Sequence, residues 1–489
     1  AAGGGMEGVR EVVAPAFAQR AMARPIPKWE LGQAGLPAAV ARQLCEDENS
    51  ADANPRRNLA SFCTTWMEPE VRELIGANLN VNAVDADEYP SVRRIEARCV
   101  AMIAKLFHAD GLGAKAAGAA TIGSSEAIML CGLAMKMKWQ ARSRKRKGDG
   151  AGRPNLVMGA NVQVCWEKFC VYFDVEPRFV PNDEEHLCLN VDKALTMVDE
   201  NTIGLCVILG STYTGHFEDV LAADRGLAQL KAQEGWEVPI HVDAASGGFV
   251  APFIAPDLQW DFRVPSVASI NVSGHKYGLV YPGVGWAVWR SWDHVPDALV
   301  FHTNYLGSDL PTITLNFSKG ASHIVAQYYQ FLRLGHEGYS HIMSNLQTIA
   351  GFLKEKISAS SRFIVRSPEV GVPLVAFSLA PQEGRTMMYD EFDLADKLRA
   401  FGWIVPAYTM SHDAQHIRIL RIVVREDLSM ALAEQLLQDL EEAVHYLDVH
   451  MPFKTADELK QHDTTLKKKF MLKFLAHRLK KRAGHRGVC

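Results

Sequence analysis

The stretch HVDAASGG (His241–Gly248), with SGHKYG (Ser273–Gly278) further along the chain, decides how this sequence folds. Each stretch follows an apolar run that is typical of a buried strand. The roughly thirty residues between Asp243 and Lys276 suit two parallel strands joined by a crossover. We therefore expect an aspartate at the end of one strand of a parallel sheet and a lysine just beyond another.

The alternation of elements extends on both sides of these motifs. Between residue 58 and about residue 345, strand-like runs alternate with helical patterns, which indicates an α/β fold with a mostly parallel sheet. One helix is expected over Glu126–Arg142, with Ser124 or Ser125 as its N-cap. The runs that predict strands are Asn155–Met158, Ile203–Leu209, Ile240–Val242, Val267–Val272 and Gly285–Trp289.

Beyond about residue 349 helices and strands mix differently, which predicts a smaller α+β domain. We predict four parts: an N-terminal segment (1–57), a large domain (58–345), a small C-terminal domain (346–450) and a basic tail (451–489). The elements expected in the small domain are a helix near Thr348–Ser358, strands over Phe363–Val365, Leu374–Leu379 and Ile417–Val424, and helices over Glu391–Phe401 and Met430–Leu447.

Composition excludes several classes of protein. The chain has 489 residues, 48% hydrophobic and 22% charged, and its net charge of −4 argues against a nucleic-acid binder. No apolar run approaches the roughly 20 residues needed to span a bilayer. Nine scattered cysteines without a CxxC pair favour free thiols in a reducing compartment, so we expect a cytoplasmic protein without a metal site. The Ala-rich first 24 residues suit a flexible or partner-docking arm, with a transit peptide as the alternative.

An aspartate and a lysine in these positions are what a pyridoxal phosphate (PLP) enzyme needs. The lysine amine holds the aldehyde as a Schiff base, and burial favours its neutral, nucleophilic form. The carboxylate keeps the pyridine nitrogen protonated, so that the ring can accept electrons. Taken singly, Asp243 could be a helix N-cap and Lys276 a solvated surface charge. Their pairing, with the small Ala245 and glycines beside Asp243, favours the cofactor.

The cofactor's phosphate needs a cradle of its own. The string TIGSSEA (Thr121–Ala127) opens a helix, and free backbone N–H groups with the hydroxyls of Ser124 and Ser125 favour an anion there. A plain serine cap is the alternative interpretation. Ser273 and His275 flank the lysine and can reach the same phosphate from the other side.

Further strings relate the sequence to one family. It resembles the glutamate decarboxylases of the bacterial and plant type, within the PLP-dependent transferase fold type I. The resemblance runs in order over residues 57 to 450 and implies a large, mostly parallel-sheet domain with a smaller α+β C-terminal domain. The matching strings are NLASF (58–62), DEYP (87–90), TIGSSEA (121–127), TYTG (212–215), HVDAASGGF (241–249), APD (255–257), SGHKYG (273–278), NFS (316–318) and AQYY (326–329).

The resemblance implies a role for each matching residue around the cofactor. Lys276 would carry PLP and Asp243 would contact its nitrogen. Gln163 would lie over the ring, where many other decarboxylases have a histidine, with Ala245 on the opposite face and Thr212 near the ring hydroxyl. The phosphate would be held by Ser124, Ser125, Ser273 and His275, with Ser318 from a neighbouring subunit. Such sharing implies at least a homodimer, with a hexamer as a further option.

Two groups of residues would select the substrate. Arg421 is a cation inside a strongly apolar strand, which is costly unless the charge is paired, and a substrate carboxylate is a good bidentate partner. An intramolecular salt bridge is the alternative. The resemblance implies that Arg421 holds the α-carboxylate. It also implies a pocket for the distal carboxylate formed by Ser61 (Thr in bacterial relatives), Phe62, Asn82 and Asp85, with Phe317 from the partner chain. Asp85 would have to be protonated or act through hydrogen bonds there, which could couple activity to pH.

The expected reaction is α-decarboxylation of L-glutamate to 4-aminobutyrate and carbon dioxide. Tyr305, in a Gly-containing loop, is a candidate proton donor, with simple loop packing as the alternative. Other acidic substrates such as aspartate, an aromatic amino acid, or a catalytically dead scaffold are the competing interpretations. Gln163 and the Asn82–Tyr89 stretch argue against the aromatic class, and the intact Lys276, Asp243 and Arg421 argue against the scaffold.

The basic tail contains a stretch, residues 467–482, without any acidic residue. Phe470, Phe474 and Leu479 lie four and five positions apart, a pattern that suits an amphipathic helix of the kind calmodulin binds. Plant members of the family carry a calmodulin-binding extension in the matching place, but with a tryptophan anchor, whereas this chain has none after Trp403. Membrane-surface binding and a disordered tail remain the alternatives.

Overall fold

The computed structural model of the chain describes residues 29–85, 87–109, 113–147, 152–303, 310–383 and 387–451. These fall into two compact units, one ending at Pro55 and one beginning at Arg56. The first unit contains helix α2 (Ala38–Asn49), stabilised on its surface by the Arg42–Glu46 ion pair. Among the described residues, we find no helix with the length and apolar character that a bilayer span requires.

The second unit is built on a seven-stranded sheet with the order β1-β7-β6-β5-β4-β2-β3. Strand β7 runs antiparallel to both of its neighbours, and the other pairs are parallel. Strands β2, β4, β5, β6 and β7 are buried along their whole length, which explains why they read as continuous apolar runs. The strands are β1 (Gly118–Thr121), β2 (Asn155–Gly159), β3 (Glu176–Val180), β4 (Thr202–Ile208), β5 (Ile240–Asp243), β6 (Val267–Ser273) and β7 (Gly285–Trp289).

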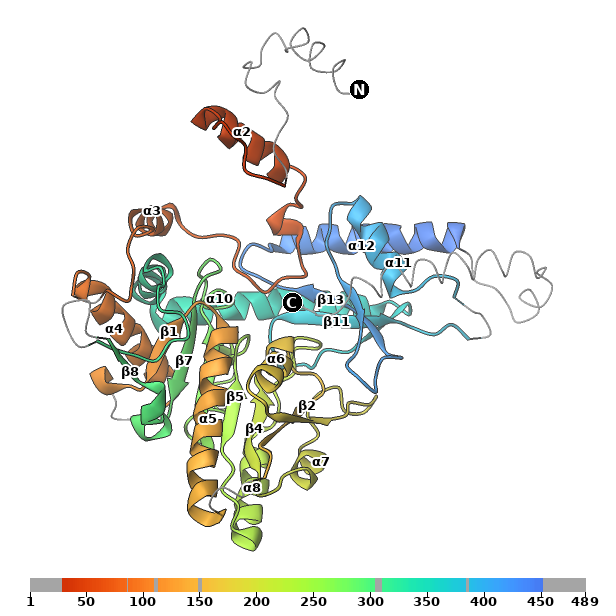
Figure 1. Cartoon of the computed structure of the whole chain (residues 1–489). Coiled ribbons are helices and arrows are strands. Elements are labelled where there is room, and N and C mark those ends of the chain that lie inside the picture. Colours follow the sequence, from red (N-terminus) through yellow and green to blue (C-terminus); the bar gives the residue numbers. More distant parts are fainter. Residues whose placement is uncertain are drawn as a thin grey trace, which may run out of the picture. The chain divides into compact units, whose positions relative to one another are not determined.

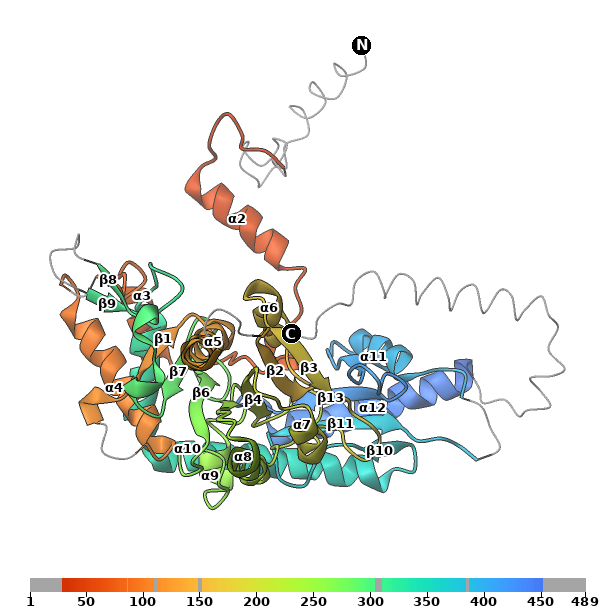
Figure 2. The same cartoon turned by 60° about the horizontal axis from the view of Figure 1, so that its bottom comes forward.

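Helices cover both faces of this sheet. Helix α5 packs across β1, β7, β6 and β4, with α6 beside it, and Figure 2 shows these two helices on one face and α8 on the other. The helices of this part are α3 (Pro69–Ala77), α4 (Pro90–Leu106), α5 (Ser124–Lys147), α6 (Val164–Tyr172), α7 (Val191–Thr196), α8 (Val220–Glu234) and α9 (Ala251–Ile254). Short 3-10 turns occupy Pro55–Arg57, Gly113–Lys115, Trp292–His294 and Asp297–Leu299.

A second, antiparallel sheet of four strands has the order β10-β11-β13-β12. The long helix α10 (Ser322–Ala359), bent at Gly335, packs on α4 and α9 near the large sheet and on β10, β11 and α12 near the small one (Figure 1). The small-sheet elements are β10 (Phe363–Val365), β11 (Leu374–Leu379), β12 (Ala407–Thr409), β13 (Arg418–Val423), α11 (Glu391–Ala400) and α12 (Met430–His450). A separate hairpin pairs β8 (Phe301–Thr303) with β9 (Leu310–Thr312).

The predicted fold class is confirmed: a large, mostly parallel sheet is joined by a smaller α+β part. The sequence analysis missed β1 (GAAT), which is too short and small-residued to read as a strand, and β3, an edge strand that contains Pro177. The helix expected near Thr348–Ser358 is the end of α10. Since α10 runs through residue 345 and contacts both sheets, the division of the chain at that point stays a prediction.

The carboxyl ends of the parallel strands lie together along one side of the large sheet, which we call the sheet edge. Strands β1 and β6 both run antiparallel to β7, so they are parallel to each other and to β5, β4 and β2. Ligands of open α/β sheets bind at the carboxyl ends of such strands. The residues that end these strands or follow them are Ser124, Gln163, Thr212, Asp243 and Lys276.

Candidate active site

Asp243, the last residue of β5, is a buried carboxylate whose hydrogen-bond donors, among the described residues, are all neutral. Its side chain accepts hydrogen bonds from Trp166 Nε1 at 2.9 Å, Asn271 Nδ2 at 3.0 Å and the Ala245 backbone N–H at 3.2 Å. Only 5% of the residue is exposed, and within the described part of the chain no lysine, arginine or histidine forms an ion pair with it. A buried carboxylate is costly unless a cation approaches it, so this position suits a cationic group of a ligand.

Lys276 lies in the turn that follows β6. Its Nζ donates to Ser246 Oγ at 3.1 Å and lies 5.3 Å from the centre of the Phe62 ring. Burial lowers the pKa of the Lys276 ammonium, although the nearby Asp243 opposes that shift. The amine is therefore biased toward the neutral form that attacks an aldehyde. The next residue, Tyr277, fixes the turn. Its hydroxyl lies 3.1 Å from the carbonyl oxygen of Pro373, just before β11, and 3.1 Å from that of Val424, just after β13.

The start of α5 forms a cradle for an anion. Ser124 opens the helix and its hydroxyl contacts that of Ser273, while Ser125 is exposed. The His275 ring packs against Gly123, where an added Cβ would come within 3.3 Å of it. Burial and the neighbouring Lys276 lower the pKa of His275 to about 4, and its buried Nδ1 has no partner among the described residues. Free helix amides, two hydroxyls and an unsatisfied imidazole suit a phosphate.

Close approach of the backbone completes this cradle. A Cβ at Gly285, the first residue of β7, would lie 2.7 Å from the backbone nitrogen of Ser124 and 2.5 Å from the carbonyl carbon of Gly123. Only glycine lets β7 pass directly behind the start of α5. An anion cradle, a buried carboxylate and an amine biased toward neutrality together fit the three polar ends of PLP: its phosphate, its pyridine nitrogen and its aldehyde.

Arg421 on β13 is a buried cation that lies against the same Phe62 ring as Lys276. Its Nη1 donates to the carbonyl oxygen of Thr212 at 2.6 Å and its Nη2 to that of Ala60 at 2.5 Å. The residue is 1% exposed, its Nε has no partner in the described part of the chain, and no carboxylate described there forms an ion pair with it. The guanidinium lies 4.9 Å from the centre of the Phe62 ring, the same ring that lies beneath Lys276 Nζ.

The remaining predicted residues near the sheet edge have backbone-directed contacts. Gln163 is the N-cap of α6, and its Oε1 accepts from the Cys165 N–H at 2.6 Å. That helix carries Trp166 to Asp243. Ser61 follows the segment that accepts from Arg421, and its own carbonyl oxygen accepts from Arg425 Nη1 at 3.0 Å.

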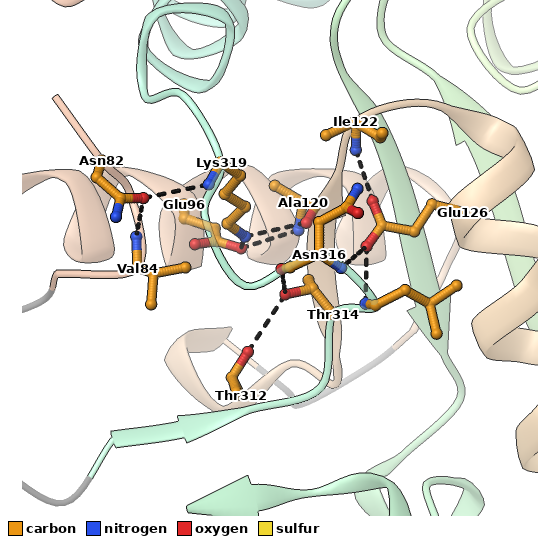
Figure 3. Close-up of polar contacts among 11 residues, drawn as sticks. Asn82, Val84, Glu96, Ala120, Ile122, Glu126, Thr312, Thr314, Asn316 and Lys319 are labelled. Carbon is orange, nitrogen blue, oxygen red and sulfur yellow. Dashed lines mark hydrogen bonds and ion pairs between the residues drawn. The ribbon is translucent and has the colours of Figure 1, made fainter. Parts of the chain in front are cut away.

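A second group of polar contacts, which includes the predicted residue Asn82, surrounds the segment from Thr312 to Lys319 (Figure 3). Asn82 Oδ1 accepts from the backbone N–H of Lys319 at 3.1 Å and from that of Val84 at 3.4 Å. The Lys319 ammonium forms a buried ion pair with Glu96 Oε1 at 2.9 Å, and the same oxygen accepts from the Ala120 N–H at 2.9 Å. This cluster fixes the end of the segment that carries Phe317 and Ser318.

Glu126, in the first turn of α5, fixes the beginning of that segment. Its carboxylate accepts from the backbone N–H groups of Ile122 at 2.8 Å, Leu315 at 2.9 Å and Asn316 at 3.3 Å (Figure 3). We call residues 315–318 the exposed loop, because Phe317 is 37% exposed and Ser318 is also exposed. The anchor at Glu126 places this loop directly beside the phosphate cradle.

The structure thus brings the predicted residues together in two groups. One group lies at the carboxyl ends of the strands and contains Lys276, Asp243, Phe62, Arg421 and Thr212. In the other, Asn82 binds the backbone of Lys319, directly after the exposed loop, and Glu126 of α5 binds the beginning of that loop. No hydrogen bond or ion pair among the described residues joins Asn82 or Asp85 to Phe62 or Arg421. Four predicted residues lie outside the described residues: Tyr305, Phe470, Phe474 and Leu479.

Sequence reasoning missed several residues that contact the predicted ones. Asn271 could have been found from register, because it sits opposite Asp243 on the neighbouring strand β6. Ser246 is three residues after Asp243, inside the quoted motif. Trp166 gave no signal, since its contact with Asp243 depends on how α6 packs.

Comparison with known proteins identifies the family. The model of the pyridoxal-dependent decarboxylase conserved domain matches residues 33–380. Glutamate decarboxylase 5 of Arabidopsis thaliana is 56% identical over 86% of this chain and 84% of its own length, and the glutamate decarboxylase of Solanum lycopersicum is 54% identical over 89% and 86%. This chain belongs to the glutamate decarboxylase family.

Structural comparison agrees with this membership. The solved glutamate decarboxylase of Lactobacillus brevis has a TM-score of 0.85 and 44% identity, covering 90% of this chain and 99% of its own. The chain is therefore an enzyme of the PLP-dependent decarboxylases, and PLP is its cofactor. The residues at the edge of the large sheet are the ones in this family member whose chemistry fits that cofactor.

Proposed function

We propose that this enzyme removes the α-carboxylate of L-glutamate, giving 4-aminobutyrate and carbon dioxide. The observation that carries the proposal is Arg421, a buried cation with an unsatisfied Nε and without a carboxylate partner among the described residues. It shares the Phe62 ring with Lys276, so a carboxylate bound to Arg421 would lie beside the amine that holds the cofactor. The names of the similar proteins support glutamate as the substrate.

The chain's own residues would hold PLP and its charge. PLP, when bound, supplies a cationic ring that accepts the electrons released as the carboxylate leaves. Asp243 would keep the ring nitrogen protonated, and Lys276 would hold the cofactor and reclaim it after product release. Gln163 and Ala245 would contact the two ring faces, and Thr212 would lie near the ring hydroxyl. The phosphate would be bound by Ser124, Ser125, Ser273 and His275, with Ser318 of a second copy of the chain.

Two further groups would orient glutamate. Arg421 would hold the α-carboxylate, the group that is lost, in a fixed orientation beside Lys276. Ser61, Phe62, Asn82 and Asp85 would bind the distal carboxylate, with Asp85 acting through hydrogen bonds. Phe317 of a second copy would close that pocket, and Tyr305 would return a proton to Cα. Sharing of this kind requires at least a homodimer, with a hexamer as a further option.

Regulation by calcium and calmodulin is part of the proposal and rests on the tail sequence alone. Residues 467–482 combine basic charge with Phe470, Phe474 and Leu479, which suits a helix laid into a hydrophobic groove. A chain truncated before Thr465 should lose calcium-dependent binding to calmodulin. If the truncated chain still binds calmodulin, or if the tail binds anionic vesicles instead, this part of the proposal fails. We also propose a cytoplasmic location, on a separate basis: the cysteines of the described part of the chain are free thiols, and the chain belongs to the glutamate decarboxylase family.

Product analysis tests the substrate. Purified enzyme supplied with PLP should form 4-aminobutyrate from glutamate, with much slower turnover of aspartate and tyrosine. If aspartate loses carbon dioxide faster than glutamate does, aspartate is the substrate and the proposal is wrong on this point. Cofactor binding without turnover of any of the three would favour the scaffold interpretation.

A further inference from the structure

A chain of buried hydrogen bonds leads away from Asp243 inside the large sheet. Asn271 Nδ2 donates to Asp243 Oδ1 at 3.0 Å, and Asn271 Oδ1 lies 2.8 Å from Nε2 of His241. Nδ1 of His241 lies 2.8 Å from the hydroxyl oxygen of Ser269. These three residues, His241 on β5 with Ser269 and Asn271 on β6, are at most 1% exposed. The order of contacts is therefore Ser269, His241, Asn271, Asp243.

The chemistry of the groups fixes the direction of every bond in this chain. An ionised carboxylate can only accept, so the Asn271 amide must turn its NH2 toward Asp243 and its oxygen toward His241. Nε2 of His241 must then carry the proton, since two acceptors would otherwise face each other. A neutral imidazole has one proton, so Nδ1 accepts from the Ser269 hydroxyl. All of the donors point toward Asp243.

The reverse direction would require a different charge on Asp243. If the carboxyl group were protonated and donated to Asn271, the amide would turn over, and His241 would accept through Nε2 and donate through Nδ1 to Ser269. Asp243, however, also receives the Trp166 indole N–H and the Ala245 backbone N–H. Together with the Asn271 amide these donors cover both oxygens, which is the environment of an ionised carboxylate.

The groups that surround His241 keep it neutral. Burial lowers the pKa of His241 to about 4, against the opposing pull of Asp243. The Trp166 ring covers the imidazole edge-on, with the ring centres 5.1 Å apart. Cys206, opposite His241 on β4, and Cys131, which contacts Ser269, are thiols whose pKa burial raises, so neither carries charge.

We propose that His241 is a positioning residue of the decarboxylation: its Nε2–H fixes the Asn271 amide so that it donates to Asp243 and holds that carboxylate ionised toward the cofactor's pyridine nitrogen. The inference rests on the proposed function, which assigns Asp243 to that nitrogen. His241 touches neither substrate nor cofactor in this account. Its effect passes through Asn271 and is read out at the cofactor.

The test compares three variants with the wild-type holoenzyme, using PLP labelled with 15N at the pyridine nitrogen. His241→Phe keeps a ring against Trp166 but removes the donor. We expect its nitrogen resonance to move toward the unprotonated position and its PLP affinity and kcat to fall by about 10- to 100-fold, the effect of one hydrogen bond in a charged network. KM for glutamate should change less than about threefold. His241→Gln, whose amide can again donate to Asn271 Oδ1, should recover most of both losses.

Ile270→Ala provides the matched control. Ile270 lies on β6 between Ser269 and Asn271, is fully buried, and by strand alternation faces away from His241. This variant should lose stability while its nitrogen resonance stays at the wild-type position. If His241→Phe leaves the resonance and PLP affinity unchanged, or if Ile270→Ala changes both equally, the inference is wrong.

Two further readings keep the test decisive. If His241→Phe yields no folded holoenzyme, Ser269→Ala takes its place, because it leaves the imidazole but releases Nδ1. A smaller shift in the same direction supports the inference, and no shift overturns it. A wild-type enzyme that is inactive on glutamate refutes the proposed function alone, since nitrogen protonation and PLP affinity are measured without substrate.

Discussion

Asp243 and Phe317 are both site residues by sequence, yet the structure surrounds them in opposite ways. Asp243 is 5% exposed, and it accepts hydrogen bonds from Trp166, Asn271 and Ala245. Phe317 is 37% exposed, and the contacts around it bind the backbone of its loop to Glu126, Asn82 and Glu96 through Lys319. The hydrogen bonds of Asp243 come from the large sheet and from α6, whereas the exposed loop is held through its backbone and presents Phe317 and Ser318 at the surface.

The largest effect is expected from removing the Lys276 amine, on the Asp243 side of this comparison. Lys276→Ala should abolish formation of 4-aminobutyrate, because it removes the amine that lies beside Ser246 and the Phe62 ring and that would hold the cofactor. The fold should persist, since Tyr277 keeps its contacts with Pro373 and Val424. Product formation and far-ultraviolet circular dichroism measure the two outcomes. Normal rates in this variant would contradict the assignment of Lys276 as the residue that holds the cofactor.

Arg421→Met should reduce kcat/KM for glutamate by about 10²- to 10³-fold, the cost of leaving a buried charge unpaired. Arg418→Met is the matched control on the same strand, because Arg418 pairs with Asp390 and, within the described part of the chain, forms no ion pair or hydrogen bond with Phe62 or Lys276. Steady-state kinetics on both variants give the answer. If both variants lost kcat/KM equally, the role of Arg421 would be structural.

Mixing two inactive chains sharpens the comparison directly. Chains with Lys276→Ala keep an intact exposed loop, and chains with Phe317→Ala keep an intact cofactor side. If the loop serves a second copy, mixed dimers contain one complete site, and equal mixing should restore about a quarter of the wild-type activity. Refolding or exchange of the mixture followed by an activity assay measures this. Activity that never exceeds the sum of the separate variants would mean that each loop serves its own chain.

Glu126→Gln should lower kcat/KM by about tenfold, because one charge-assisted acceptor of the loop's N–H groups is lost. Glu391→Gln is a fitting control: Glu391 is also buried in the first turn of a helix and accepts a backbone N–H, that of Leu379. Both variants should lose similar stability in denaturant. A similar loss of activity in both would separate the exposed loop from catalysis.

The last effect concerns stability at acid pH and not activity. The pKa of His241 falls from 6.5 to about 4 on folding, so the unfolded chain binds more protons between these values. Stability is then lost as the pH falls through this window, by about 3 kcal/mol from this residue. His241→Gln should unfold in guanidinium with a shallower pH dependence between about pH 7 and about pH 5. An unchanged slope would mean that His241 does not titrate as its burial implies.

Sequence alone predicted the site residues that stand in short, continuous motifs. Asp243, Lys276 and the helix start at Ser124 stand in short motifs whose spacing reports strand ends, and the structure puts them at one sheet edge. Trp166 and Glu126 were missed, because their contacts join residues 77 and 189 positions apart and depend on packing. The role of the exposed loop came from resemblance, since nothing in its own composition marks it.

The central claim is that Lys276 carries the cofactor opposite Asp243. Borohydride reduction of the PLP-loaded enzyme followed by peptide mass spectrometry tests it most directly. We predict a stable pyridoxyl group on Lys276 and on no other lysine. Labelling of a different lysine, or loss of the cofactor's colour without any labelled peptide, would contradict the account.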